Sequence, residues 1–390
     1  MKYSLLIVII AIVLLDSTSA AAQVASPQQV QSTQTETTSE PEHTGAATDL
    51  AKRTEEEIAA LVFDAVTNRD TFRLKPLLRN MVYYRHNEAG ETALTQAILN
   101  NDPAMVRLLV RDAVINLKNK AGETPLTLAI KKNNPEIIRL VSQRAKAALK
   151  NEAGEAPIVL AIDKDDLLLV QALIAKGADV NCKSLGITPI ARATELNKLQ
   201  TVALLLKNGA NPSIPTDNGD LPLLIAVQNN FDLLAGILLH KSAQQQKDAN
   251  STTKLGEPLL NIATTNGNNQ IVRILLEYGA NTHHTDYLEN TALNIAAEKG
   301  HVAIAQMLLA AGAESDHVNI MGTTPIMAAA QNGQTDLAKQ LAEKGADPNR
   351  RNFSGIAAND FGTYAIKTSI EATYQEMLNE QSNIPKESKQ

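Results

Sequence analysis

The chain has 390 residues, a formal net charge of -6, one cysteine and no tryptophan. A length of this kind ordinarily indicates two or three domains, unless the chain is a repeat array, which grows by addition. The acidic balance argues against a general nucleic-acid binder, because neutralising phosphates requires a basic surface. The single Cys182 excludes an intramolecular disulfide and any multi-cysteine metal site. We interpret it as a structural residue, with a reactive or intermolecular thiol as the alternative.

Residues 1–22 have the pattern of a secretory signal peptide. Lys2 gives a positive start, residues 5–15 are apolar, and Ala20 to Ala22 offer a small-residue cleavage site. Eleven apolar residues are too few to span a bilayer of roughly 30 Å comfortably. We therefore expect an exported protein, with an uncleaved N-terminal anchor as the alternative. Export without disulfides favours a bacterial envelope or secreted protein.

The next two segments differ in composition. Residues 23–50 are rich in Gln, Ser and Thr with few large apolar side chains, which predicts a disordered linker. Residues 51–86 contain two apolar helical faces, so we predict a pair of capping helices or a degenerate repeat there.

A unit of about 33 residues then recurs eight times. Successive copies are separated by 32, 32, 32, 33, 37, 33 and 33 residues. Five residues beyond the first residue of each copy, all eight copies carry alanine. The first residues are Thr92, Thr124, Ala156, Thr188, Leu221, Pro258, Thr291 and Thr324. This is the signature of a repeat array.

Each copy contains the signals of two short helices. Thr-Pro pairs at Thr124, Thr188 and Thr324 predict an N-cap followed by a proline in the first helical turn. Glycines such as Gly177 and Gly312 are placed to end the second helix in the left-handed conformation. Neither helix can bury its apolar face alone, so the copies must stack.

These units resemble ankyrin repeats. The resemblance rests on sequences such as Gly122-Glu123-Thr124-Pro125-Leu126 and Tyr278-Gly279-Ala280-Asn281, and it covers eight copies over residues 87–350. It implies an all-α repeat solenoid, a curved stack of helix-turn-helix units with hairpin fingers. One position departs from the family: the histidine usual after Thr-Pro-Leu is absent from all eight copies. We therefore expect its hydrogen bonds to the adjacent loops to be missing.

Two regions lie outside the regular spacing. The 37-residue separation marks an insertion in the finger at 242–255, which is either neutral or a contact for a partner. Residues 351–379 are predicted to form a partial repeat and a capping helix with Ile366, Ile370, Tyr374 and Met377 on one face, followed by a polar tail at 380–390.

The sequence contains none of the common catalytic motifs, such as Gly-x-Ser-x-Gly, a P-loop or His-Glu-x-x-His. An open solenoid groove also rarely supplies the water-excluding site that catalysis needs. His283, His284 and Asp286 lack the spacing of metal ligands. We expect no enzymatic activity, cofactor or metal; an enzyme with an unrecognised site is the alternative.

Charge is uneven along the repeats. Residues 105–150 hold ten basic and three acidic side chains, a net of +7. Lys131 and Lys132 occupy positions that face the concave groove in ankyrin arrays. This segment is either a solvated face or a patch for an anionic partner.

The core positions repeat while the groove positions diverge, which is typical of a scaffold whose groove specifies a partner. We predict a non-enzymatic, exported, monomeric protein-binding scaffold, most simply periplasmic, with no nucleic-acid partner and no membrane contact beyond the export signal. The alternatives are a secreted effector that binds host proteins, or a degenerate array without a fixed partner. The candidate contact residues are Tyr83, Tyr84, Arg85, Lys118, Lys120, Lys131, Lys132, His284 and Tyr287.

Overall fold

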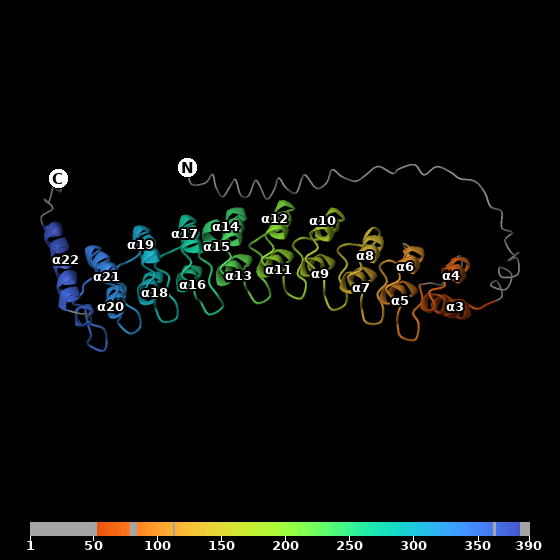
Figure 1. The fold of residues 1–390 in the computed structure, drawn as a ribbon, viewed down its shortest axis with the longest axis horizontal. Helices are drawn as coiled ribbons and strands as arrows, with labels where there is room; N and C mark the ends of the chain where they lie inside the picture. Colours follow the sequence, from red (N-terminus) through yellow and green to blue (C-terminus); the bar gives the residue numbers. More distant parts are fainter. Residues whose placement is uncertain (1–52, 79–83, 112–113, 362–363, 383–390) are drawn as a thin grey trace. The chain divides into compact units, whose positions relative to one another are not determined.

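The computed structural model describes residues 53–78, 84–111, 114–361 and 364–382. Every regular element within these ranges is a helix, and the extended segments form only isolated bridges. The described chain divides into two compact units, unit 1 up to Ala210 and unit 2 from Asn211 (Figure 1). The predicted all-α repeat fold is confirmed. The predicted signal peptide, the linker and Tyr83 lie outside the described residues.

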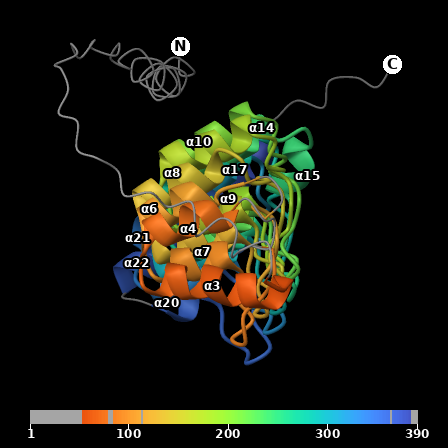
Figure 2. The same ribbon diagram turned by 90° about the vertical axis from the view of Figure 1, so that its right-hand side faces the viewer.

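Unit 1 is a stack of five helix pairs. The first pair, predicted as a cap or degenerate repeat, packs on the second as the later pairs pack on one another. Figure 2 views unit 1 from this first pair and shows α4, α6, α8 and α10 following one another in a row. The pairs are α3 (Glu55–Thr67) and α4 (Thr71–Leu77), α5 (Ala93–Leu99) and α6 (Pro103–Leu109), α7 (Pro125–Lys132) and α8 (Pro135–Ser142), α9 (Pro157–Asp163) and α10 (Leu167–Ala175), and α11 (Pro189–Glu195) and α12 (Leu199–Lys207).

Unit 2 contains four further pairs, one extra helix and a C-terminal element. Its elements are α13 (Pro222–Gln228), α14 (Asp232–Lys241), α15 (Gln245–Ala249), α16 (Leu259–Thr265), α17 (Asn269–Glu277), α18 (Ala292–Lys299), α19 (Val302–Ala310), α20 (Pro325–Gln331), α21 (Thr335–Glu343), the 3-10 helix η3 (Ala358–Asp360) and α22 (Tyr364–Ser382). The last helix packs on α21 through the fully buried Ile370, with Tyr374 and Met377 half-buried. It runs to Ser382, past the predicted end at 379, and the side chain of Ile366 is outside the described set.

The helix signals in the sequence act as predicted. The Oγ1 of Thr124 accepts the backbone N–H of Thr127 at 3.1 Å, and Thr188 and Thr324 cap their helices in the same way. The glycine that follows each nine-residue second helix is left-handed, with φ of 82° at Gly177 and 86° at Gly312, whereas the ten-residue α14 ends at Ser242. Satisfied termini let helices of seven to nine residues persist, because packing supplies the remaining stability.

One alanine and one large apolar residue are buried at the same two positions of every copy. All eight alanines at the fifth position are fully buried, and so is the large residue of each second helix. The small alanine allows the neighbouring first helix to approach closely, while the large residue removes most of the apolar area from water, worth roughly 1.5–3 kcal/mol each. The large residues are Leu109, Val141, Leu173, Leu205, Leu238, Leu275, Leu308 and Leu341.

A finger loop precedes the first helix of each of the eight copies, and in seven of them its turn is closed by a polar side chain. In unit 1, the Oδ1 of Asn119 accepts the backbone N–H of Glu123 at 2.8 Å, and Asn151 accepts that of Glu155 at the same distance. Neighbouring fingers are joined by single backbone hydrogen bonds, such as Lys120 N to Gly90 O at 2.7 Å. A Cβ on Gly90 would lie 2.2 Å from the Cβ of Lys120, so only glycine permits this approach.

The insertion before the sixth repeat forms α15, which is bonded to the structure on both sides. Asp248, which is buried, accepts hydrogen bonds from the hydroxyls of Ser213 and Ser242, each at 2.5 Å. Asn250 donates to the carbonyl of Gly279 at 2.9 Å and accepts the N–H of Asn281 at 2.7 Å. Through these hydrogen bonds, the inserted residues connect consecutive repeats of unit 2.

The expectation that loop hydrogen bonds are missing at the histidine position is wrong in two copies. Asn261 donates to the carbonyl of Asn290 at 2.9 Å, and Asn294 donates to the carbonyls of His317 and Thr323 at 3.3 and 3.4 Å. An asparagine amide at this position therefore reaches the next finger, as the family's histidine does. In unit 1 the equivalent Thr95 and Thr127 instead close capping boxes on their own helices.

Candidate binding surface

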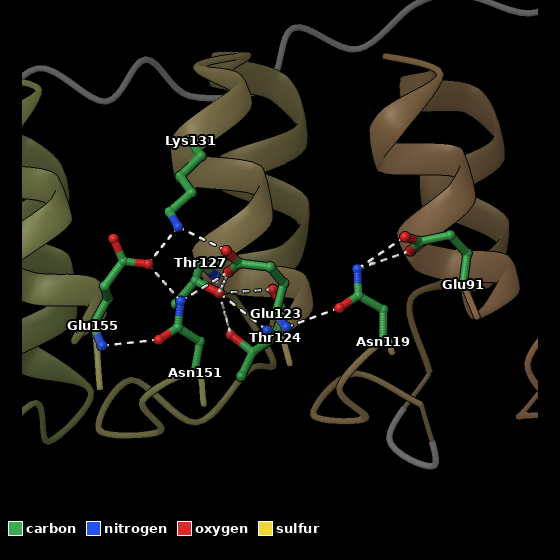
Figure 3. Close-up of polar contacts among 8 residues, drawn as sticks. All are labelled: Glu91, Asn119, Glu123, Thr124, Thr127, Lys131, Asn151 and Glu155. Atoms are coloured by element: carbon green, nitrogen blue, oxygen red, sulfur yellow. Dashed lines mark hydrogen bonds and ion pairs between the residues drawn. The ribbon is translucent and has the colours of Figure 1, made fainter. Parts of the chain in front are cut away.

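The groove side of unit 1 contains a network of carboxylates, amides and one lysine (Figure 3). Glu123 precedes α7 and Glu155 precedes α9, so the two carboxylates come from consecutive fingers. The Nζ of Lys131 lies 2.6 Å from Glu123 Oε1 and also contacts Glu155. Asn151 donates to Glu123 at 3.0 Å and to Glu155 at 2.6 Å. The network therefore joins two repeats.

Hydrogen bonds set the ionisation of this network. Partial burial pushes the pKa of Glu123 upward, but hydrogen bonds from Lys131, Asn151 and Thr127 outweigh it, so the pKa lies below its ordinary value. Partial burial alone would lower the pKa of Lys131, but its hydrogen bonds to Glu123 and Glu155 raise it. The predicted groove cation Lys131 is thus already neutralised from within the chain, which weakens its case as a contact for an anionic partner.

Other groove charges of unit 1 are compensated in the same manner. Arg192 lies between Asp163, at 2.6 Å, and Glu195, at 2.9 Å. The side chain of Lys132 is exposed and takes part in no hydrogen bond or ion pair with another described residue. Of the predicted Lys131–Lys132 pair, only Lys132 presents a charge that the described chain leaves uncompensated.

The remaining candidates of unit 1 lie on fingers. Lys118 is half-buried, and its carbonyl accepts a hydrogen bond from His86 Nε2 at 2.9 Å. Lys120 is exposed at a finger tip. Arg85 forms an ion pair with Glu55 of α3 at 2.7 Å, and Tyr84 beside it is 45 % exposed. The structure therefore separates these residues: Tyr84 and Lys120 face solvent, while Arg85 is engaged with its own unit.

In unit 2, consecutive finger tips expose large apolar side chains. Tyr287 was predicted and is 77 % exposed; Leu255 is 86 %, Met321 59 % and Phe353 80 % exposed. We call Leu255, Tyr287, Ile320, Met321 and Phe353 the apolar tip row. Backbone hydrogen bonds join three of its fingers, from Ile320 N to Leu288 O at 3.1 Å and from Phe353 N to Met321 O at 3.2 Å. His284 lies in the same finger as Tyr287, before its tip.

Sequence reasoning found only Tyr287 of this row. The signal was present, because the residues three and four places before each helix start can be compared across repeats. In unit 1 these places hold Glu88, Lys120 and Glu152 with alanines beside them, and only Leu185 is a large apolar residue. The tips change from polar or charged to apolar after the fifth copy, and this change is the signal of the row in the sequence.

A carboxylate pair lies at the base of the same fingers. Glu257 corresponds to Glu123 in its repeat, but Asp286 stands where unit 1 has Asn151, and Thr265 stands where unit 1 has Lys131. No side chain of the described part of the chain donates a hydrogen bond to the carboxylate of Glu257 or forms an ion pair with it. Partial burial, followed by the charge of Asp286, raises the pKa of Glu257.

The remaining surface features give weaker evidence for a binding site. An open depression of about 500 Å³ lies on the second helices of unit 1, lined by Lys75, Asp102, Arg107 and Glu136 among others, and the ion pair between Arg107 and Glu136, at 2.6 Å, joins two of its sides. The described residues contain no group of three or more His, Cys, Asp or Glu side chains arranged to hold a metal ion. No helix within the described ranges is both long and apolar enough to cross a membrane.

Paired helices, left-handed glycine ends and stacked fingers define a helical repeat solenoid. A family described as ankyrin repeats (3 copies) matches residues 62–152, 140–216, 158–248, 223–319 and 260–352. The chain therefore belongs to the ankyrin-repeat family. The human ASB11 ankyrin repeat domain is similar, with 25% sequence identity and a TM-score of 0.46 over 56% of this chain and 98% of that chain. A comparison with curated proteins finds no match.

Proposed function

We propose that this chain is an exported, non-enzymatic scaffold that binds a protein partner. Ankyrin-repeat folds are typically binding scaffolds. The observation that carries the proposal is that eight copies keep the same buried alanine and large apolar residue while their groove and tip residues differ. A surface that varies over a constant core is free to specify a partner.

Export is proposed from the sequence of residues 1–22, and the periplasm is the compartment that such a signal reaches without a second secretion system. Reading the N-terminus of the mature chain by mass spectrometry after cell fractionation tests it. A periplasmic chain that begins near Gln23 supports the proposal, while an intact Met1 in the membrane fraction contradicts cleavage.

Partner binding is tested by cross-linking cells that produce the tagged full chain, followed by capture and protein identification. The control is an unrelated exported protein that carries the same signal segment and tag. We expect a small set of proteins enriched over this control. If no protein is enriched, the array has no fixed partner and the proposed function fails.

A further inference from the structure

The apolar tip row contains five of the eight exposed large apolar side chains in the described part of unit 2. Its side chains occupy equivalent places on four consecutive fingers, and none is needed to complete the core, which is filled by the alanines and leucines described above. Soluble monomers rarely leave contiguous apolar patches open unless they bind something. Aromatic residues such as Tyr287 and Phe353 are also the type that contributes most to interfaces.

The charges beside the row indicate what covers it. The finger turns at residues 253–257 and 286–290 contain the acidic Glu257, Asp286 and Glu289 against one base, Lys254, a net of -2. Such a surface repels anionic lipid headgroups and attracts a basic group.

In unit 1, two carboxylates at the bases of consecutive fingers receive hydrogen bonds from within the chain. There, Lys131 lies between Glu123 and Glu155, and Asn151 donates to both. In unit 2 the lysine is replaced by Thr265, the asparagine by Asp286 and Glu155 by Asn290, whose Nδ2 donates to Asp286 at 3.2 Å but not to Glu257. Glu257 is consequently half-buried without a donor from the described chain. A cation from outside the chain is the group that this position lacks.

We propose that the apolar tip row of unit 2 binds a segment of another protein that combines apolar side chains, which cover Leu255, Tyr287 and Phe353, with a lysine or arginine that pairs with Glu257 and Asp286. The inference rests on the proposed function and names the chemistry of the partner. The basic group of the segment takes the place that Lys131 has in unit 1. The apolar side chains remove the exposed tips from water and supply most of the affinity.

The test uses a displayed library of short random peptides selected on the immobilised full chain. We expect the enriched peptides to combine apolar residues with at least one Lys or Arg. A fluorescently labelled enriched peptide is then titrated with wild type and with the double variant Tyr287→Ser, Phe353→Ser. Both side chains are largely exposed, so the fold should survive, which circular dichroism checks. We expect the affinity to fall about tenfold or more.

Matched controls come from unit 1. Leu185→Ser alters its exposed apolar tip and should leave the affinity unchanged. Glu257→Gln should weaken binding and reduce its salt dependence, whereas Glu152→Gln, on an exposed tip of unit 1, should not. The proposal is overturned if no peptide is enriched, if the enriched peptides lack basic residues, or if the double variant binds as wild type does.

A second copy of the chain or a lipid membrane could also cover the apolar tip row, and each alternative has its own test. Light scattering of the full chain overturns the proposal if it finds a dimer that the double variant cannot form, because the row then binds a second copy. Flotation with phosphatidylcholine–phosphatidylglycerol vesicles overturns it if the chain floats and the double variant does not. If a partner captured from cells binds the double variant as tightly as it binds wild type, this inference is wrong, whereas the proposed function still holds.

Discussion

The two units join their repeats by different chemistry and at different positions of the repeat. Unit 1 places Glu123, Asn151 and Lys131 in an ionised network that spans two fingers. Unit 2 uses the buried neutral amides of Asn261 and Asn294, which donate to the backbone of the next finger. Glu257, the unit 2 counterpart of Glu123, has no side-chain donor in the described chain, so a carboxylate that joins repeats in unit 1 is an available charge in unit 2. A glutamate at one repeat position can therefore either join two repeats or remain available to a partner.

Placing the acid of unit 2 at the equivalent position of unit 1 should disrupt the network there. Asn151→Asp removes two donated hydrogen bonds, at 3.0 and 2.6 Å, and adds a third carboxylate beside Glu123 and Glu155. We expect it to lower the free energy of unfolding by about 2–3 kcal/mol. Urea denaturation at neutral pH measures the loss. The reciprocal Asp286→Asn should instead stabilise by about 0.5 kcal/mol, since it offers Glu257 a donor; destabilisation there would contradict the assigned correspondence.

The second prediction concerns the amide of unit 2. Asn294→Ala removes the capping box and both hydrogen bonds to the next finger, at a residue only 4 % exposed. We expect a loss of about 1–3 kcal/mol and faster hydrogen exchange in α20. Thr127→Ala in unit 1 is the control, because Thr127 bonds only within its own repeat. Equal exchange in α20 of wild type and Asn294→Ala would show that the amide does not couple repeats.

The third prediction sharpens the role of charge. Lys131→Met should destabilise unit 1 by about 0.5–1 kcal/mol, a modest value because the ion pairs are partly exposed to solvent. The difference from wild type should shrink in molar salt, which screens these pairs. Lys132→Met, which removes an exposed lysine with no such contacts, should leave stability unchanged. Denaturation at low and high salt compares the two, and a salt-independent loss would point to packing of the lysine stem.

The contributions of Glu123 and Glu257 to the free energy of unfolding should depend on pH in opposite directions, and both effects should be small. The pKa of Glu123 is lowered on folding, so its contribution is present above the unfolded pKa of about 4.3 and is lost as pH falls through the folded value. The pKa of Glu257 is raised, so its contribution is present below about 4.3 and is lost as pH rises through the folded value.

Replacing each glutamate by glutamine measures these two opposite contributions to stability. At pH 7, Glu123→Gln should be less stable than wild type and Glu257→Gln more stable, and both differences should close in acid. Thermal unfolding across pH measures them. A stabilising effect of Glu257→Gln that persists unchanged in acid would rule out its ionisation as the cause.

Much of the fold followed from local chemistry that repeats. The fully buried alanines, the Thr124 cap and the left-handed Gly177 each depend on residues within one copy, so the sequence was sufficient to predict them. The state of Lys131 was not, because its second partner, Glu155, lies 24 residues away in the next copy. Counting charges over residues 105–150 gave a net sign and hid this pairing.

The same limit explains the misjudged histidine position. A family comparison says which residue is absent, whereas the geometry of the neighbouring finger decides what can replace it. Asn294 carries a donor close enough to the carbonyls of His317 and Thr323, and Thr127 does not reach that far. The tip row was missed for another reason: exposed positions tolerate any residue, so their regularity has meaning only when it departs from the tips of unit 1.

The single backbone bonds between fingers have a consequence for proteolysis. A protease needs its substrate as an extended segment, and exposed loop tips are where nicking normally begins. A tip that is bonded to its neighbour must first detach, so cutting at Ile320 or Phe353 requires two fingers to open together. The tip at Lys254 and Leu255 has no backbone bond to another finger within the described chain, so trypsin should cut after Lys254 before it cuts after Lys120, whose finger is bonded to its neighbour.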